Sequence, residues 1–222
     1  MKFSTLASAT ITLLVLMGSS LNAVASIIYL SDERNITHTT EGTINPDTAF
    51  GNFTATVADI NGLASASQNS SMDSLSMTGE GRNMVTEVGA WPNLIDTSST
   101  FSVTFTVDEL TDFSLSGFFD TFWISADQPY VNLYENGIDL FSLSAWDHPD
   151  AAWEQIVNFN YTGQFNVGDT YQLLLVTDGT PTTSGNNWGF NVSTVPLPAS
   201  VWLFGSGLLG IIGFARRRIH TQ

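Results

Sequence analysis

The sequence predicts an all-β chain built around one β-sandwich or jelly-roll-like domain. Short segments alternate between apolar and polar residues at every second position, which is the period of a half-buried strand. Turn signals separate these segments at intervals of roughly eight to twelve residues, as is typical of sandwiches. No stretch carries the apolar period of an amphipathic helix over several turns. An apolar run near each end predicts a signal peptide before the domain and one transmembrane helix after it.

Residues 1–25 have the organisation of a signal peptide. Lys2 supplies a positive charge, an apolar stretch covers residues 6–16, and Ala23-Val24-Ala25 is a small-x-small cleavage sequence. We expect cleavage before Ser26, which leaves an exported domain over residues 26–194. A first membrane anchor is the alternative, but the apolar stretch is short for a bilayer. The chain contains no cysteine, so no disulfide framework supports the exported domain.

The domain over residues 26–194 is strongly acidic. It holds all 21 acidic residues, while Arg34 and Arg82 are its only basic residues, which gives a formal charge of −19. Phosphate repulsion therefore excludes nucleic acid as a partner, and it disfavours anionic membrane surfaces. Such a surface stays soluble and attracts cations. Ca²⁺ held at Asp-containing turns is one interpretation, and solvated aspartates that hydrogen-bond their own backbone are the other.

The clearest strand of the domain covers residues 101–107. Phe101, Val103, Phe105 and Val107 alternate there with Ser and Thr, so one face is expected in the core. The same alternation continues through Phe113, Leu115 and Gly117, and further strands are predicted at residues 130–134, 138–143, 156–161, 171–177 and 188–192.

Turn chemistry and composition predict how some of these strands are arranged. Asn136-Gly137 between two strands is a strong hairpin signal, because both central residues of a type I′ turn need a positive φ. We expect the strands at 156–161 and 171–177 to pair with each other. Weaker strands are predicted at residues 27–30 and 49–57. Residues 62–77 are rich in Ala and Ser, which bury little area, so an edge strand or a long loop is expected there.

The last 28 residues, 195–222, form a tail in three parts. Val195-Pro196-Leu197-Pro198 is extended, because each proline fixes φ and restricts the residue before it. Residues 199–215 carry no charge and make roughly 26 Å of helix, close to the thickness of a bilayer core. Arg216, Arg217 and Arg218 follow and should remain on the cytoplasmic side, which places the domain outside the cytoplasm. A buried core helix is the alternative, but this run has no polar face.

This tail resembles the PEP-CTERM sorting signal of Gram-negative bacteria in its Val-Pro-Leu-Pro-Ala variant. The resemblance covers residues 195–218, with Leu197 where the family usually has glutamate. It implies recognition by an exosortase, a membrane-embedded cysteine transpeptidase. It also implies anchoring in the cytoplasmic membrane, cleavage near the Pro-x-Pro sequence, and release or transfer of the domain to the cell surface or to an extracellular polysaccharide matrix.

One segment of the domain has the residue types of a ligand-binding loop. Indole rings stack on sugars, and carboxylates accept sugar hydroxyls or hold Ca²⁺. The candidate ligand-binding residues are Trp146, Asp147, His148, Asp150, Trp153 and Glu154. They follow a predicted strand, so they are expected in a loop at one end of the sandwich. The alternative is a connection whose tryptophans cover the core and whose acids are solvated.

The sequence argues against catalysis. Two paired carboxylates would suit a glycosidase, but nothing in the sequence fixes their separation. The domain has only two histidines and no Gly-x-Ser-x-Gly motif, which disfavours a serine hydrolase and a histidine-rich zinc site. We therefore expect a non-enzymatic, exported surface or matrix protein with a structural role in extracellular polysaccharide. A carbohydrate-binding module, with or without Ca²⁺, is the second hypothesis.

Overall fold

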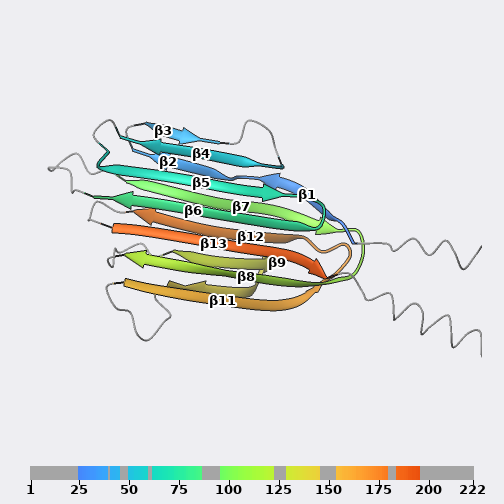
Figure 1. Ribbon diagram of the computed structural model, residues 1–222. Coiled ribbons are helices and arrows are strands. Elements are labelled where there is room, and N and C mark those ends of the chain that lie inside the picture. Colours follow the sequence, from blue (N-terminus) through green and yellow to red (C-terminus); the bar gives the residue numbers. More distant parts are fainter. Residues whose placement is uncertain are drawn as a thin grey trace, which may run out of the picture. The chain divides into compact units, whose positions relative to one another are not determined.

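The computed structural model describes residues 25–39, 41–45, 50–59, 62–86, 96–122, 129–145, 154–179 and 184–195. They belong to one compact unit, Ala25–Val195, which contains two antiparallel sheets (Figure 1). The expected signal peptide, the Pro-x-Pro sequence, the apolar run and the three arginines lie outside the described residues. Within the described part of the chain, no helix is long and apolar enough to cross a membrane.

The first sheet, sheet A, has the order β10-β9-β12-β7-β2-β3, with β1 beside β2 along the same edge of β7. Its strands are β1 (Ile27–Asp32), β2 (Asn35–His38), β3 (Gly42–Ile44), β7 (Thr97–Val107), β9 (Tyr130–Glu135), β10 (Ile138–Ser144) and β12 (Tyr171–Gly179). The second sheet, sheet B, has the order β11-β8-β13-β6-β5-β4. Its strands are β4 (Phe53–Ala58), β5 (Ala64–Met72), β6 (Ser76–Val85), β8 (Thr111–Phe122), β11 (Glu154–Phe165) and β13 (Ser184–Val195).

The last eight strands form a jelly roll, as the sequence predicted. Each strand of the first four pairs antiparallel with its mirror in the last four: β6 with β13, β7 with β12, β8 with β11, and β9 with β10. The chain therefore behaves as one long hairpin that wraps into two sheets. The tip of this hairpin is Asn136-Gly137, where φ is 51° and 80°, so the expected positive-φ turn is confirmed.

The jelly roll corrects one predicted pairing. The strands at 156–161 and 171–177 do not pair with each other. The first belongs to β11, which pairs with β8 in sheet B, and the second belongs to β12, which pairs with β7 and β9 in sheet A. The connection at residues 166–170 thus passes from one sheet to the other. The prediction paired two strands that are neighbours in the sequence. It was wrong because, when a long hairpin wraps into two sheets, each of these two strands pairs with a strand that is distant in the sequence.

Residues 62–77 are also more regular than predicted. They contain β5, which lies inside sheet B between β4 and β6. Its inward positions, which are Ala64, Ala66, Gln68, Ser70 and Met72, are all buried. Small side chains bury little area each, but the alternation still gives this strand one inward face. The expectation of an edge strand or a long loop was therefore wrong.

The core lies between the sheets and is rich in aromatic residues. The predicted inward face of β7 is confirmed, because Phe101, Val103, Phe105 and Val107 are all buried. Rings from the two sheets meet there: Phe101 packs edge-on against Phe190, with centroids 4.6 Å apart. Such pairs add to the free energy gained from burial alone. A rigid core of this kind fixes the positions of the residues on the outer face of sheet B.

Candidate functional site

The structure leaves the predicted loop site largely untested. Residues 146–153, which include both tryptophans, lie outside the described residues. Glu154 is the first residue of β11. Among the described residues, no three His, Asp or Glu side chains gather closely enough to hold a metal ion. The described part of the chain offers a different candidate, which is the outer face of sheet B.

The outer face of sheet B is a layer of small polar side chains. Cross-strand register places one residue of each strand in a row, and side chains in a row share a face. The central row is Thr54, Asn69, Glu80, Gly189, Phe118 and Asn158. With strands about 4.8 Å apart, such a row is roughly 24 Å long. The neighbouring rows are dominated by Ser, Thr and Asn.

Phe118 is the one aromatic side chain of the central row. Its ring lies over Gly189 of the adjacent strand, so closely that a Cβ at that position would overlap Phe118 Cε1 and lie 2.9 Å from Cζ. The ring is partly exposed. Glycine therefore lets an aromatic ring lie low on the sheet surface. We call Phe118 over Gly189 the Phe118 platform.

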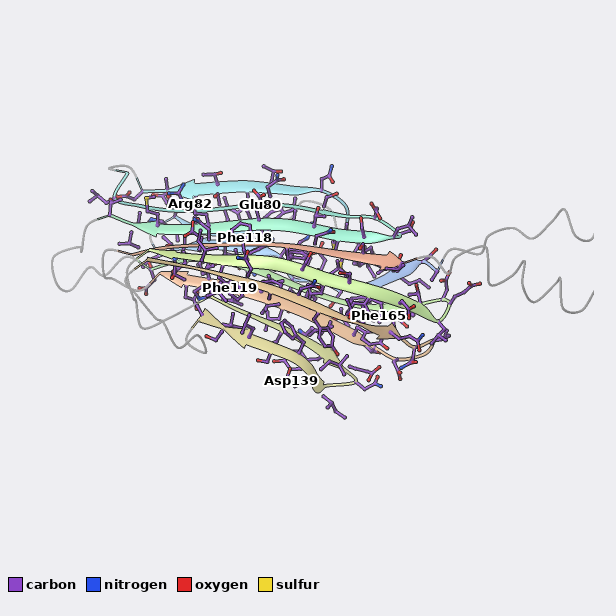
Figure 2. The ribbon with its side chains drawn as sticks, turned by 60° about the horizontal axis from the view of Figure 1, so that its bottom comes forward. Glu80, Arg82, Phe118, Phe119, Asp139 and Phe165 are labelled. Carbon is purple, nitrogen blue, oxygen red and sulfur yellow. The ribbon has the colours of Figure 1, made fainter. Side chains whose placement is uncertain are left out.

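Charged and amide groups border the Phe118 platform. Asp120 follows on the same strand, and its Oδ2 accepts a hydrogen bond from Asn187 Nδ2 at 3.2 Å. Glu80 and Arg82 lie on β6, on the far side of β13 (Figure 2). Among the described residues, no carboxylate lies within ion-pair distance of Arg82, whose guanidinium lies 3.8 Å from Met84 Sδ. Donors and acceptors are therefore present on both sides of the ring.

Two adjoining depressions lie over this face, with volumes of about 350 Å³ and 510 Å³. Both are lined by residues of sheet B alone. They share Asn69, Glu80 and Phe118 in their linings. One extends along the strands to Thr78 and Asn191, and the other to Arg82 and Asp120. Together they make a shallow, open surface with an aromatic ring at its middle, which suits a flat and extended ligand better than a small enclosed one.

The layer beneath this surface is tightly packed. Trp188 is fully buried below it and lies against Gly81, where a side chain would overlap the indole. Its Nε1 donates to the backbone oxygen of Ser99 in sheet A at 3.4 Å. The two sheets therefore lie close together under the candidate site. This packing holds the backbone of the outer face in one conformation and reduces the entropy lost on binding.

Sequence reasoning missed this site, although a signal for it was present. The outward positions of β8 are Ser114, Ser116, Phe118 and Asp120, so a large aromatic residue stands where the alternation predicts a polar one. The sequence did not reveal which residue lies beside Phe118. Gly189 lies beside Phe118 only because β13 and β8 pair, and these strands are far apart in the chain.

Comparison with known proteins identifies the tail. The PEP-CTERM protein-sorting motif matches residues 194–218. The chain carries a PEP-CTERM motif. Such a motif marks a protein for export and for sorting by an exosortase at the membrane. The match starts two residues before Pro196, at Thr194, which still belongs to β13. Sandwich and PEP-CTERM motif therefore overlap, with no linker between them.

No curated protein sequence matches the chain. Among solved structures, it is similar to the isomalto-dextranase of Arthrobacter globiformis T6 complexed with panose, at 11% identity and a TM-score of 0.22 over 76% of this chain and 32% of that one. The GH31 alpha-xylosidase of Xanthomonas citri matches at 10% identity and a TM-score of 0.21, over 78% and 28%. The chain spans about a third of the length of these proteins, and TM-scores this low carry no argument.

Proposed function

We propose that this chain is an exported, non-enzymatic surface or matrix protein whose sandwich binds extracellular polysaccharide through the outer face of sheet B. The PEP-CTERM motif supports the extracellular destination. In this account the tail anchors the precursor in the cytoplasmic membrane, with the domain outside, until an exosortase removes the tail near Pro196-Leu197-Pro198. Arg216, Arg217 and Arg218 hold the end of the tail on the cytoplasmic side.

The Phe118 platform is the observation that carries the binding role. A sugar ring presents an apolar face of C–H groups and a rim of hydroxyls. An aromatic ring matches the first, and the surrounding Asn, Ser, Thr and carboxylate groups match the second. The row of side chains extends across all six strands of sheet B. A polymer is therefore a better ligand for this face than a single sugar.

The negative charge of the domain favours a neutral polysaccharide as its ligand. The domain has many acidic residues and only two arginines, so a polyanionic polysaccharide is repelled at low salt. Ca²⁺ is the exception to test, because a bridging cation would reverse this preference. Binding to neutral and anionic polysaccharides, with and without a chelator, decides between these modes.

The experiment is affinity electrophoresis or a glycan array with the processed protein. We expect Phe118→Ala to weaken binding by roughly tenfold or more, because it removes the stacking surface. Tyr130→Ala is the matched control, a partly exposed aromatic residue on the other sheet. Unaltered binding by Phe118→Ala would refute the role of this face.

The predicted loop site is tested in the same assay. Trp146→Ala and Trp153→Ala should leave binding intact if the outer face of sheet B is the site. If these variants lose binding while Phe118→Ala keeps it, the polysaccharide binds at the loop that contains Asp147, His148 and Asp150 instead. Intact mass of the protein from its host tests the sorting role, because a processed protein lacks both ends of the chain.

A further inference from the structure

The sorting tail leaves the sandwich without any spacer. Val195 is the last residue of β13 and still pairs with Asp112 of β8. On the other side of β13, Thr194 donates from its backbone nitrogen and from Oγ1 to the Leu75 oxygen, at 3.0 and 3.1 Å. Pro196-Leu197-Pro198 comes directly after the last paired residue of β13.

An enzyme that grips the Pro-x-Pro sequence must therefore meet this end of the sandwich. The connections that flank β13 are the β5–β6 turn on one side and the β7–β8 turn on the other. The first carries Leu75, which is 41% exposed, and the second carries Leu110, which is 49% exposed. Val195 between them is 46% exposed. Three aliphatic side chains thus surround the point at which the tail leaves.

The exposed position of Leu75 is held by the fold. Asp73 Oδ1 accepts hydrogen bonds from the backbone nitrogens of Leu75, at 2.7 Å, and of Ser76, at 2.8 Å. The hydrogen bond from Leu75 is the main reason that the pKa of Asp73 lies below its usual value. A turn capped in this way presents its leucine in a fixed geometry. An exposed leucine in a fixed position offers apolar area that a partner can bury.

The negative charge at this end of the sandwich indicates which kind of partner would fit it. Asp73, Asp108 and Asp112 are exposed around the three aliphatic residues. Both described arginines lie elsewhere, on the β1–β2 connection and in the middle of β6. An anionic lipid surface is repelled by such a rim. A protein surface with an apolar centre and basic groups around it is complementary to it.

We propose that the membrane-embedded exosortase docks on this end of the sandwich while it processes the tail. We call the docking site the exit surface, and its residues are Leu75, Leu110, Val195, Asp73, Asp108 and Asp112. This inference rests on the proposed sorting of the chain. The exosortase thereby reads the folded domain as well as the motif. Because the motif begins inside β13, only a precursor whose last strand is in place presents both features together.

The test follows conversion of the full-length precursor to its processed form in cells that contain the exosortase. We expect the double variant Leu75→Ser/Leu110→Ser to slow this conversion at least about fivefold, from the lost apolar contact. The control is Ile44→Ser/Ile156→Ser, which changes two aliphatic residues that are also exposed but lie near the opposite ends of the strands. This control should be processed at the normal rate.

A spacer variant keeps the inference testable even if the double variant folds poorly. Eight Gly and Ser residues inserted between Val195 and Pro196 separate the motif from the exit surface. We expect slow processing, and no further slowing when Leu75→Ser/Leu110→Ser is added. Normal processing of the spacer variant would overturn the inference.

The failures are distinguishable. If the unaltered precursor is not processed at all, the sorting role itself fails. If it is processed and the folded double variant keeps its rate, only the exit surface fails. A last measurement is binding of the processed protein to phosphatidylglycerol vesicles. If the unaltered protein binds them and the Leu75→Ser/Leu110→Ser variant does not, the exit surface binds lipid and the inference is overturned.

Discussion

The Arg34 guanidinium binds the Asp32 carboxylate through two hydrogen bonds, 2.7 Å from Nε to Oδ1 and 2.6 Å from Nη2 to Oδ2. Both side chains are out of contact with water, at 0% and 1% exposure. Nη1 of Arg34 also donates to the Gly51 oxygen and to Ser70 Oγ, at 2.8 and 3.2 Å. The pair therefore joins the end of β1 and the β1–β2 connection in sheet A to the segment just before β4 and to β5 in sheet B.

Removing the arginine from this pair should destabilise the domain strongly. Arg34→Met leaves the Asp32 carboxylate buried without its cation, so we expect the free energy of unfolding to fall by about 3–5 kcal/mol. Urea denaturation measures this. Arg82→Met is the control and should cost little, because Arg82 is exposed and lacks an ion pair among the described residues. A loss below about 1 kcal/mol for Arg34→Met would contradict the structural role of the pair.

The same pair makes stability depend on acid pH. Burial by itself would raise the pKa of Asp32, but the hydrogen bonds from Arg34 and from the backbone of Phe50 outweigh it, so the pKa lies below the usual 3.8. A depressed pKa contributes stability above pH 4 or so, and this is lost as the pH falls through the folded value.

The measurement is the free energy of unfolding between about pH 5 and pH 2. We expect Asp32→Asn to start from a lower value and to lose less over this range than the unaltered protein, because Asn does not titrate. Other carboxylates titrate in both proteins, so the difference between the two curves isolates Asp32. Parallel curves would show that Asp32 keeps an ordinary pKa.

Two glycines of sheet B should lose different amounts of stability on the same substitution. At Gly81 a Cβ would overlap Trp188, which is fully buried and has no room to move. We expect Gly81→Ala to lower the free energy of unfolding by about 1–3 kcal/mol. At Gly189 the overlap is with Phe118, whose ring is partly exposed and free to turn outwards. Gly189→Ala should cost less than about 1 kcal/mol but weaken polysaccharide binding.

Equal losses of stability at the two positions would contradict this. In that case the Phe118 ring would be held as firmly as the indole of Trp188. Thermal unfolding measures stability and affinity electrophoresis measures polysaccharide binding. Only Gly189→Ala is expected to weaken binding without much loss of stability.

The core also contains hydroxyl groups that gain nothing from burial. Thr177 Oγ1 is buried and has no hydrogen-bond partner among the described residues. We expect Thr177→Val to leave the free energy of unfolding unchanged or to raise it by up to about 1–2 kcal/mol, because a methyl group carries no desolvation penalty. The melting temperature should stay the same or rise accordingly. Thr106→Val is the contrasting variant. Thr106 Oγ1 donates to the Asp169 oxygen at 2.8 Å, so its loss should lower stability by about 1 kcal/mol. A drop for Thr177→Val would mean that its hydroxyl is hydrogen-bonded in solution.

Local patterns were enough to predict much of this fold. The alternation at residues 101–107 gave the inward face of β7, and Asn136-Gly137 gave the turn at the tip of the jelly roll. The Pro-x-Pro sequence, apolar run and arginines gave the sorting motif, which the family comparison confirms. Each of these features lies within one short segment, where the period of a strand, the φ angle of a turn or the charge of a tail acts without help from the rest of the chain.

Tertiary structure decided what depends on distant segments. Backbone hydrogen bonds are much alike in every antiparallel pair, so the sequence of β11 did not reveal that β8 is its neighbour. The same holds for Phe118 over Gly189 and for Leu75 beside the end of β13. The sequence alone determined where most strands form and which sorting motif the chain carries. Strand pairing, which depends on how the whole hairpin wraps around its aromatic core, decided which side chains became a surface.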